Sequence, residues 1–124
     1  MNKIPKISDA EWEIMNLVWE KYPLSTNEIV EKLSEQKSWH NSTIRTLINR
    51  LVRKKALRFD AQGKQYLYHP LVPREECVRN ESRSFTERVF GGAPTPMLAH
   101  LVKNTRLTQK DIEELKSILE EKEK

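Results

Sequence analysis

The chain has 124 residues, the size of one small domain with a compact appendage, which excludes a large multidomain enzyme. Hydrophobic residues make up 37% and charged residues 32%, and only 3 residues are glycine, which is typical of a folded, helix-rich protein and excludes a disordered or fibrous one. Because the sequence has no apolar run long enough to span a bilayer and only one cysteine, Cys77, we expect neither membrane insertion nor an internal disulfide. These features favour a cytoplasmic location.

The charge is distributed unevenly along the chain, although the total is only +4. Residues 1–37 carry a net charge of −2 (5 basic, 7 acidic), residues 38–64 carry +6 (7 basic, 1 acidic), and residues 65–124 balance at 10 of each sign. A local excess of cations is typical of a surface that binds a polyanion. A basic stretch taken alone is also typical of an ordinary solvated helix face. The elements predicted on either side of it therefore decide between the two interpretations.

Two helix starts with the same signature lie in the N-terminal third. Each has a serine that can cap the helix and a glutamate three residues later that can bond back to it, with apolar residues on either side. The pairs are Ser8 with Glu11 and Ser25 with Glu28. They predict a helix that ends near Glu20 and a short helix that ends near Gln36.

A third helix, from about Asn41 to Lys55, is predicted from apolar residues at helical spacing. This buried stripe consists of Ile44, Leu47, Ile48 and Leu51. Because successive residues are about 100° apart around a helix, the other side is polar and basic. That side and its flanks hold Ser42, Thr43, Arg45, Thr46, Asn49, Arg50 and Arg53. We expect this face to point outward, towards a partner.

The next segments are typical of a β-hairpin. Residues 57–59 and 66–69 are rich in Leu, Phe and Tyr, and the connection between them contains Gly63, which can adopt the positive φ of a tight turn. Pro70 and Pro73 then end the second strand and mark a linker.

Beyond the linker we expect three amphipathic helices: one over 74–90, a short one after the prolines at 94 and 96, and a last one that opens with Thr108 and Asp111 and ends near Glu121. A segment of this length rarely forms a stable core alone, so its apolar stripes should pack against a second copy of the chain. The candidate dimerisation residues are Val78, Phe85, Val89, Met97, Leu98, Leu101, Ile112, Leu115 and Leu119.

Three helices followed by a hairpin, with a basic third helix, form the layout of a winged helix-turn-helix. The expected fold is mainly α with a small β-hairpin wing: a winged helix-turn-helix DNA-binding domain over 1–72 and a three-helix dimerisation domain over 73–124. A helix fits the major groove of double-stranded DNA, and the wing can lie along the phosphates. The candidate DNA-binding residues are Ser42, Thr43, Arg45, Thr46, Asn49, Arg50, Arg53, Lys54 and Lys64.

The side-chain types suggest a division of roles within this set. Arg45 and Arg50 can each donate two hydrogen bonds to a guanine edge, and Asn49 can pair with adenine. The hydroxyl side chains suit phosphates or thymine methyl groups, whereas Lys54 and Lys64 suit phosphate charge.

Motifs along nearly the whole chain resemble one known family. They are Ile7-Ser8-Asp9-Ala10-Glu11-Trp12-Glu13-Ile14-Met15, Thr43-Ile44-Arg45-Thr46-Leu47-Ile48-Asn49-Arg50-Leu51, Phe90-Gly91-Gly92 and Asp111-Ile112-Glu113-Glu114-Leu115, with Trp19, Ser25 and Trp39. The chain is thereby similar to the BlaI/MecI penicillinase repressors. The resemblance implies a homodimeric repressor that binds a short palindromic operator and controls resistance genes, such as those of a β-lactamase or a penicillin-binding protein. It also implies release from DNA when a membrane-bound sensor protease causes a cut in the C-terminal segment.

Two positions depart from the family pattern. Where the β-lactam repressors have an Asn-Phe bond, the candidate cleavage region here is Leu98-Ala99-His100-Leu101, so another release signal stays open. At the start of the basic helix, the family's Ser-Pro-Lys is replaced by His40-Asn41-Ser42, and either His40 or Asn41 could cap the helix.

Other classes of function find little support in the sequence. The sequence has no Gly-rich phosphate loop, no catalytic nucleophile with a general base at a suitable spacing, and no histidines at the spacing of metal ligands. We therefore expect that the protein is not an enzyme and binds no cofactor and no metal. The three tryptophans could stack on single-stranded bases, but their positions favour the core. The remaining alternative is a winged-helix adaptor that binds another protein and not DNA.

Overall fold

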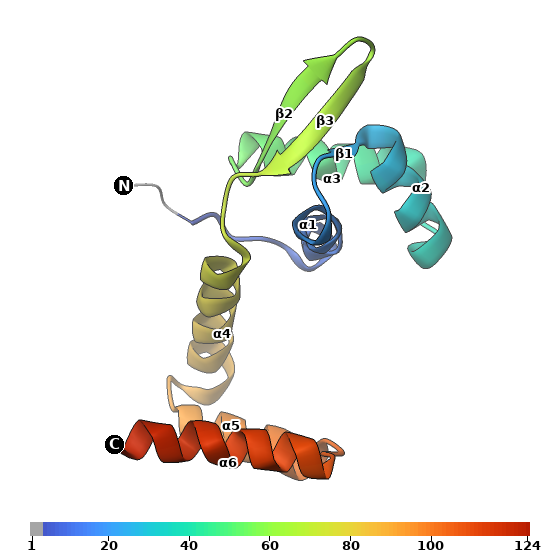
Figure 1. The fold of residues 1–124 in the computed structure, drawn as a ribbon. Helices are drawn as coiled ribbons and strands as arrows, with labels where there is room; N and C mark the ends of the chain where they lie inside the picture. Colours follow the sequence, from blue (N-terminus) through green and yellow to red (C-terminus); the bar gives the residue numbers. More distant parts are fainter. Residues whose placement is uncertain (1–3) are drawn as a thin grey trace. The chain divides into compact units, whose positions relative to one another are not determined.

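The protein is described from a computed structural model that defines residues 4–124. It folds as two compact units, one that runs to Ser82 and one from Arg83 to Lys124. The elements are, in chain order, α1 (Asp9–Glu20), β1 (Leu24–Ser25), α2 (Thr26–Lys37), α3 (Asn41–Arg53), β2 (Leu57–Gln62), β3 (Gln65–Pro70), α4 (Arg74–Phe90), α5 (Pro94–Asn104) and α6 (Gln109–Glu123) (Figure 1). The predicted fold class, mainly α with a small β-hairpin wing, is confirmed.

The three predicted capping boxes are all present, and they fix where α1, α2 and α6 begin. In each, the hydroxyl of the capping residue accepts from the backbone N–H three residues later, and the acidic side chain there accepts from the cap's own N–H. The four side-chain to backbone distances in the first two boxes lie between 2.8 and 3.3 Å. The boxes are Ser8 with Glu11, Ser25 with Glu28, and Thr108 with Asp111.

Two predicted helix bounds were wrong by about two residues. Helix α3 ends at Arg53 and not at Lys55, because Lys55 takes a positive φ of 66° and the N–H of Ala56 bonds back to Leu51 O at 2.9 Å. Helix α5 begins at Pro94, before the second proline, because the first helical residues need no N–H donor within the helix.

The core of the first unit is built from one face of each of its first three helices and from the sheet. Burial is nearly complete, and Ile14, Ile44 and Leu51 are 0% exposed. The largest buried side chains from these elements are Ile14, Met15, Val18, Leu24, Ile29, Leu33, Ile44, Ile48, Leu51 and Leu57. Trp12, Trp19 and Trp39 pack against this cluster, as the sequence favours, and Trp19 Nε1 donates to Val72 O at 2.9 Å.

The sheet has three antiparallel strands in the order β1-β3-β2, so the hairpin carries a short strand that the sequence analysis missed. Strand β1 pairs Leu24 with Tyr68. The hairpin itself is longer than predicted: β2 and β3 pair up to Gln62 with Gln65, and a two-residue turn joins them. Gly63 occupies that turn with a φ of +62°, the conformation for which glycine was expected.

The second unit contains the end of α4 together with α5 and α6, and its apolar side chains lie largely on its surface. None of the residues of α5 and α6 is buried. Leu98, Leu101 and Leu119 are 49%, 51% and 61% exposed. In the described part of the chain, no helix is long and apolar enough to cross a membrane.

Candidate nucleic-acid interface

Helix α3 is held against the first unit by the stripe that the sequence predicted. Ile44, Leu47, Ile48 and Leu51 are at most 6% exposed, and α3 contacts α1, α2 and β2. Because this side of the helix is buried, the opposite side has to face outward.

The exposed side of α3 carries the predicted cationic face. Arg45, Arg50 and Arg53 are all exposed, and so are the neutral hydrogen-bonding groups between them. The neutral members are Ser42, Thr43, Thr46 and Asn49. The hydroxyl of Thr46 donates its hydrogen to Ser42 O at 2.9 Å. Its oxygen can therefore still accept a hydrogen bond from a partner, but its hydrogen is already used. No acidic residue lies on the helix, so nothing on α3 opposes an approaching polyanion.

The beginning of α3 lies at the end of this face. His40 is the N-cap residue, which settles the alternative left open by the sequence, but no side chain bonds to the first N–H groups. The amide oxygen of Asn41 instead accepts from Ser34 Oγ at 3.1 Å. The first turn of α3 therefore presents uncapped N–H donors, which suit a phosphate oxygen.

A polar recess of about 240 Å³ extends the interface from α3 towards the wing. Arg45 and Lys64, both predicted, line it together with Tyr66, for which strand packing is favoured from the sequence over phosphate contact, and with residues that the sequence did not indicate for this surface: Ser25, Thr26, Asn27 and Gln65. The small polar residues at the start of α2 could have indicated this surface from the sequence, because the N-terminus of a helix attracts anions. The recess joins two predicted cations to the first turn of a second helix.

One of the two Arg and Lys side chains of the wing, Arg58, is paired with an acid. Arg58 forms two hydrogen bonds with the carboxylate of Asp60, at 2.9 and 3.0 Å, and His69 Nε2 lies 3.3 Å from the same carboxylate. Lys64, at the turn, is exposed. Within the described residues, Lys64 therefore carries a positive charge that no ion pair engages, whereas Arg58 is paired to an acid.

Lys54 differs from the other cations of the predicted set because its ammonium group is bound by acceptors of the chain itself, although the side chain is 36% exposed. It donates to the carboxylate of Glu11, which is 1% exposed, and to Lys6 O at 2.9 Å. Burial on its own would raise the pKa of Glu11, but the hydrogen bonds from Lys54 and from the N–H and hydroxyl of Ser8 outweigh it and lower that pKa. Lys54 thus joins the end of α3 to the start of α1.

The lone cysteine and the possible metal ligands within residues 4–124 supply no further site. Burial raises the pKa of the Cys77 thiol, so the reactive thiolate form is disfavoured. Among these residues no three His, Cys, Asp or Glu side chains are grouped to hold a metal ion.

Comparison with known proteins places this interface in context. The sequence profile described as "Penicillinase repressor" matches residues 7–121. The chain belongs to the penicillinase repressor family. It is 36% identical to the penicillinase repressor of Bacillus licheniformis over 98% of this chain and 94% of that protein. It is 38% identical to the methicillin resistance regulatory protein MecI of Staphylococcus aureus (strain N315), over 98% of each chain.

A solved structure in this family shares the first unit's fold. The B. licheniformis BlaI monomeric form, in complex with the blaP half-operator, is 38% identical, with a TM-score of 0.54 over 61% of this chain and 93% of that one. These relatives are named as a repressor and as a regulatory protein, and not as enzymes, which agrees with the prediction that this chain is not an enzyme.

Proposed function

We propose that this chain is a homodimeric transcriptional repressor that binds a palindromic operator, with α3 in the major groove and the wing along the phosphates. The observation that carries the proposal is the exposed, acid-free face of α3 with Arg45, Arg50 and Arg53. Because an isolated basic face could be merely solvated, the second support is the related BlaI, whose structure was solved with a half-operator. The protein would act in the cytoplasm, where the operator is accessible.

The regulated genes follow from the same relatives. One is named a penicillinase repressor and another a methicillin resistance regulatory protein. We infer that this chain controls an operon for resistance to β-lactams, containing β-lactamase or penicillin-binding protein genes.

Dimerisation is assigned to the second unit and the adjoining part of α4. Phe85, Val89, Leu115 and Ile118 are between 39% and 56% exposed in the single chain. Apolar stripes of this extent on three successive helices are typical of an interface between copies, because burying them stabilises the assembly. Of the residues predicted from the sequence, Phe85, Val89, Met97, Leu98, Leu101, Ile112, Leu115 and Leu119 are kept in this interface, to which Ile118 is added. Val78 is left out of it, because it lies in the first unit and lines a hollow there.

Release from DNA is assigned to the same unit. The candidate cleavage region, Leu98, Ala99, His100 and Leu101, lies in the middle of α5. Asn104 Nδ2 donates to His100 O at 2.9 Å, so the segment is helical and bonded on its C-terminal side. A membrane-bound sensor protease would act here only after α5 opens locally, because proteases bind extended backbone.

The proposal is tested with a variant that removes cations from α3 and leaves the core intact. Arg45→Ala with Arg50→Ala should abolish sequence-specific binding in a fluorescence anisotropy titration, while the mass of the dimer in solution stays unchanged. The matched control is Arg74→Ala with Arg79→Ala, which removes the same charge from exposed positions on α4 and should reduce affinity far less.

The adaptor alternative gives the opposite result. If the protein used this fold only to bind another protein, the two double variants would have the same affinity for DNA. Equal affinity of both variants for an operator and for a scrambled duplex would therefore contradict the repressor assignment.

A further inference from the structure

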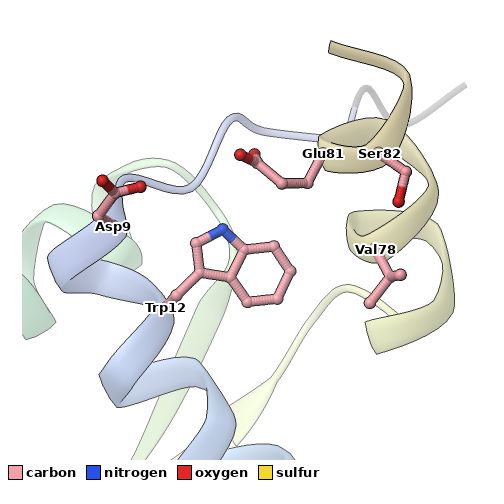
Figure 2. Close-up of a pocket in the computed structure, with 5 residues that line it drawn as sticks. All are labelled: Asp9, Trp12, Val78, Glu81 and Ser82. Atoms are coloured by element: carbon pink, nitrogen blue, oxygen red, sulfur yellow. The ribbon is translucent and has the colours of Figure 1, made fainter. Parts of the chain in front are cut away.

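A hollow separate from the α3 face lies in the first unit, between the start of α1 and the N-terminal half of α4. It has a volume of about 370 Å³ and is lined by Asp9, Trp12, Val78, Glu81 and Ser82. Figure 2 shows Glu81 extending from α4 towards Asp9, across the indole of Trp12, with Val78 beside the ring. The size falls in the range of pockets that bind small molecules.

The lining combines an apolar wall with two carboxylates. The indole of Trp12 and the side chain of Val78 make the wall, and Trp12 packs against Trp19, with the two ring centroids 5.6 Å apart. No basic side chain lines the hollow. Among residues 4–124, neither Asp9 nor Glu81 takes part in an ion pair. The hollow therefore carries two carboxylates that no ion pair neutralises, in a chain whose net charge is +4.

We propose that this hollow binds a small organic ammonium ion that is free in solution. An alkylated nitrogen gains from the face of an indole through the cation–π interaction, and its alkyl groups remove apolar surface from water against Val78. Two carboxylates at the rim add Coulomb attraction for the positive charge. Each of these groups favours the same ligand class, and an anion is repelled by the same carboxylates.

Other ligand classes fit the lining less well. A metal ion needs several oxygen or nitrogen ligands around one point, whereas most of this wall is an indole and an isopropyl group. DNA phosphates are excluded by Asp9 and Glu81, so the hollow is not an extension of the operator surface on α3.

A bound cation would contact two helices close to the point where the first unit ends. Glu81 and Ser82 are the last residues of that unit, and Asp9 is the first residue of α1. A ligand held by both helices would therefore fix the N-terminal half of α4 against α1, ahead of the segment that continues into the second unit. The binding itself does not depend on the proposed repressor function, and its test needs no DNA.

The test is a titration of the full chain with choline and with 3,3-dimethylbutan-1-ol, its uncharged isostere, followed by NMR of the indole N–H groups. The Trp12 signal is assigned by its loss in Trp12→Phe. Choline should shift the Trp12 signal saturably and bind at least about tenfold more tightly than the isostere. Equal binding of the two probes, or no saturable shift at Trp12, would overturn the proposal.

A pair of charge variants tests the carboxylates. Asp9→Asn with Glu81→Gln should weaken choline binding by about tenfold or more. The control, Glu31→Gln with Glu35→Gln, removes the same charge from exposed positions on α2 and should leave choline affinity within about twofold. Equal losses in both double variants would mean general electrostatic attraction and no site. The comparison of choline with its isostere on the unmodified chain decides the matter even if a variant fails to fold.

Discussion

The ion pair between Lys54 and Glu11 shows how a residue's environment can outweigh its position in a motif. From the sequence, Lys54 belongs with the DNA-binding cations of the third helix. In the structure it follows the last residue of α3 and neutralises a carboxylate that is 1% exposed. A buried acid has to find a cation or stay protonated, and sequence spacing does not reveal which lysine lies within reach, 43 positions away in the chain.

Replacement of Lys54 tests this structural role. Lys54→Met should lower the free energy of unfolding by about 1–3 kcal/mol, because it leaves Glu11 buried with only the bonds from Ser8. Urea denaturation measures the loss. The control is Arg53→Met, which removes an exposed neighbouring cation and should change stability by less than about 0.5 kcal/mol. Equal effects of the two substitutions would contradict the role given to Lys54.

The capping acid of α2 predicts a pH dependence of stability. The hydrogen bond from the N–H of Ser25 lowers the pKa of Glu28 below its ordinary value of 4.5. The stabilisation is therefore complete above pH 4.5 and is lost as the pH falls through the lower folded-state pKa. Glu28→Gln keeps the bond to the cap but cannot titrate, so it should flatten the fall in unfolding free energy as the pH drops below 4.5.

Urea titrations at several pH values measure this slope. The control is Glu31→Gln, at an exposed position on the same helix. This variant should show the same slope of unfolding free energy against pH as the parent chain in acid. An unchanged slope for Glu28→Gln would show that the charge of the capping box does not contribute to acid stability.

At the scale of elements, the patterns that predicted the structure were those that depend on neighbours in sequence. The capping pairs fix three helix starts, and the stripe from Ile44 to Leu51 fixes the buried side of α3. Strand β1 has two residues, too few for an alternating pattern, and it exists only because β3 pairs with it. The polar recess was missed for the same reason, since α2, α3 and the wing meet there only in the folded unit.

The wing and α3 are expected to contribute to DNA binding in different ways. Lys64→Ala should weaken binding to all duplexes about equally and reduce the slope of log affinity against log salt by about one, because one phosphate contact is lost. Arg50→Ala should instead cost about 1–3 kcal/mol on the operator and relax base preference at one position. Anisotropy titrations over a salt series measure both effects. Identical behaviour of the two variants would contradict the division of roles.

At the scale of the whole molecule, the proposed dimer depends on the exposed apolar side chains of the second unit. The double variant Leu115→Gln with Leu119→Gln should weaken the dimer by at least about a hundredfold, because each leucine contributes about 1.5–3 kcal/mol when buried and the interface uses both copies. Sedimentation or light scattering measures the mass. The control, Glu114→Gln with Glu120→Gln, places the same amides on exposed polar positions of α6 and should leave the dimer intact. Unchanged dimerisation of the leucine variant would move the interface elsewhere.

The most direct measurement of the central claim is a fluorescence anisotropy titration of the full chain against a TACA-spacer-TGTA palindrome, the operator type that the family resemblance implies, and a scrambled duplex, at about 50 and 200 mM salt. The account predicts one dimer per palindrome, a preference of about 4 kcal/mol or more over the scrambled duplex, and a steep loss of affinity at the higher salt. Weak binding that is equal on both duplexes and insensitive to salt would contradict it.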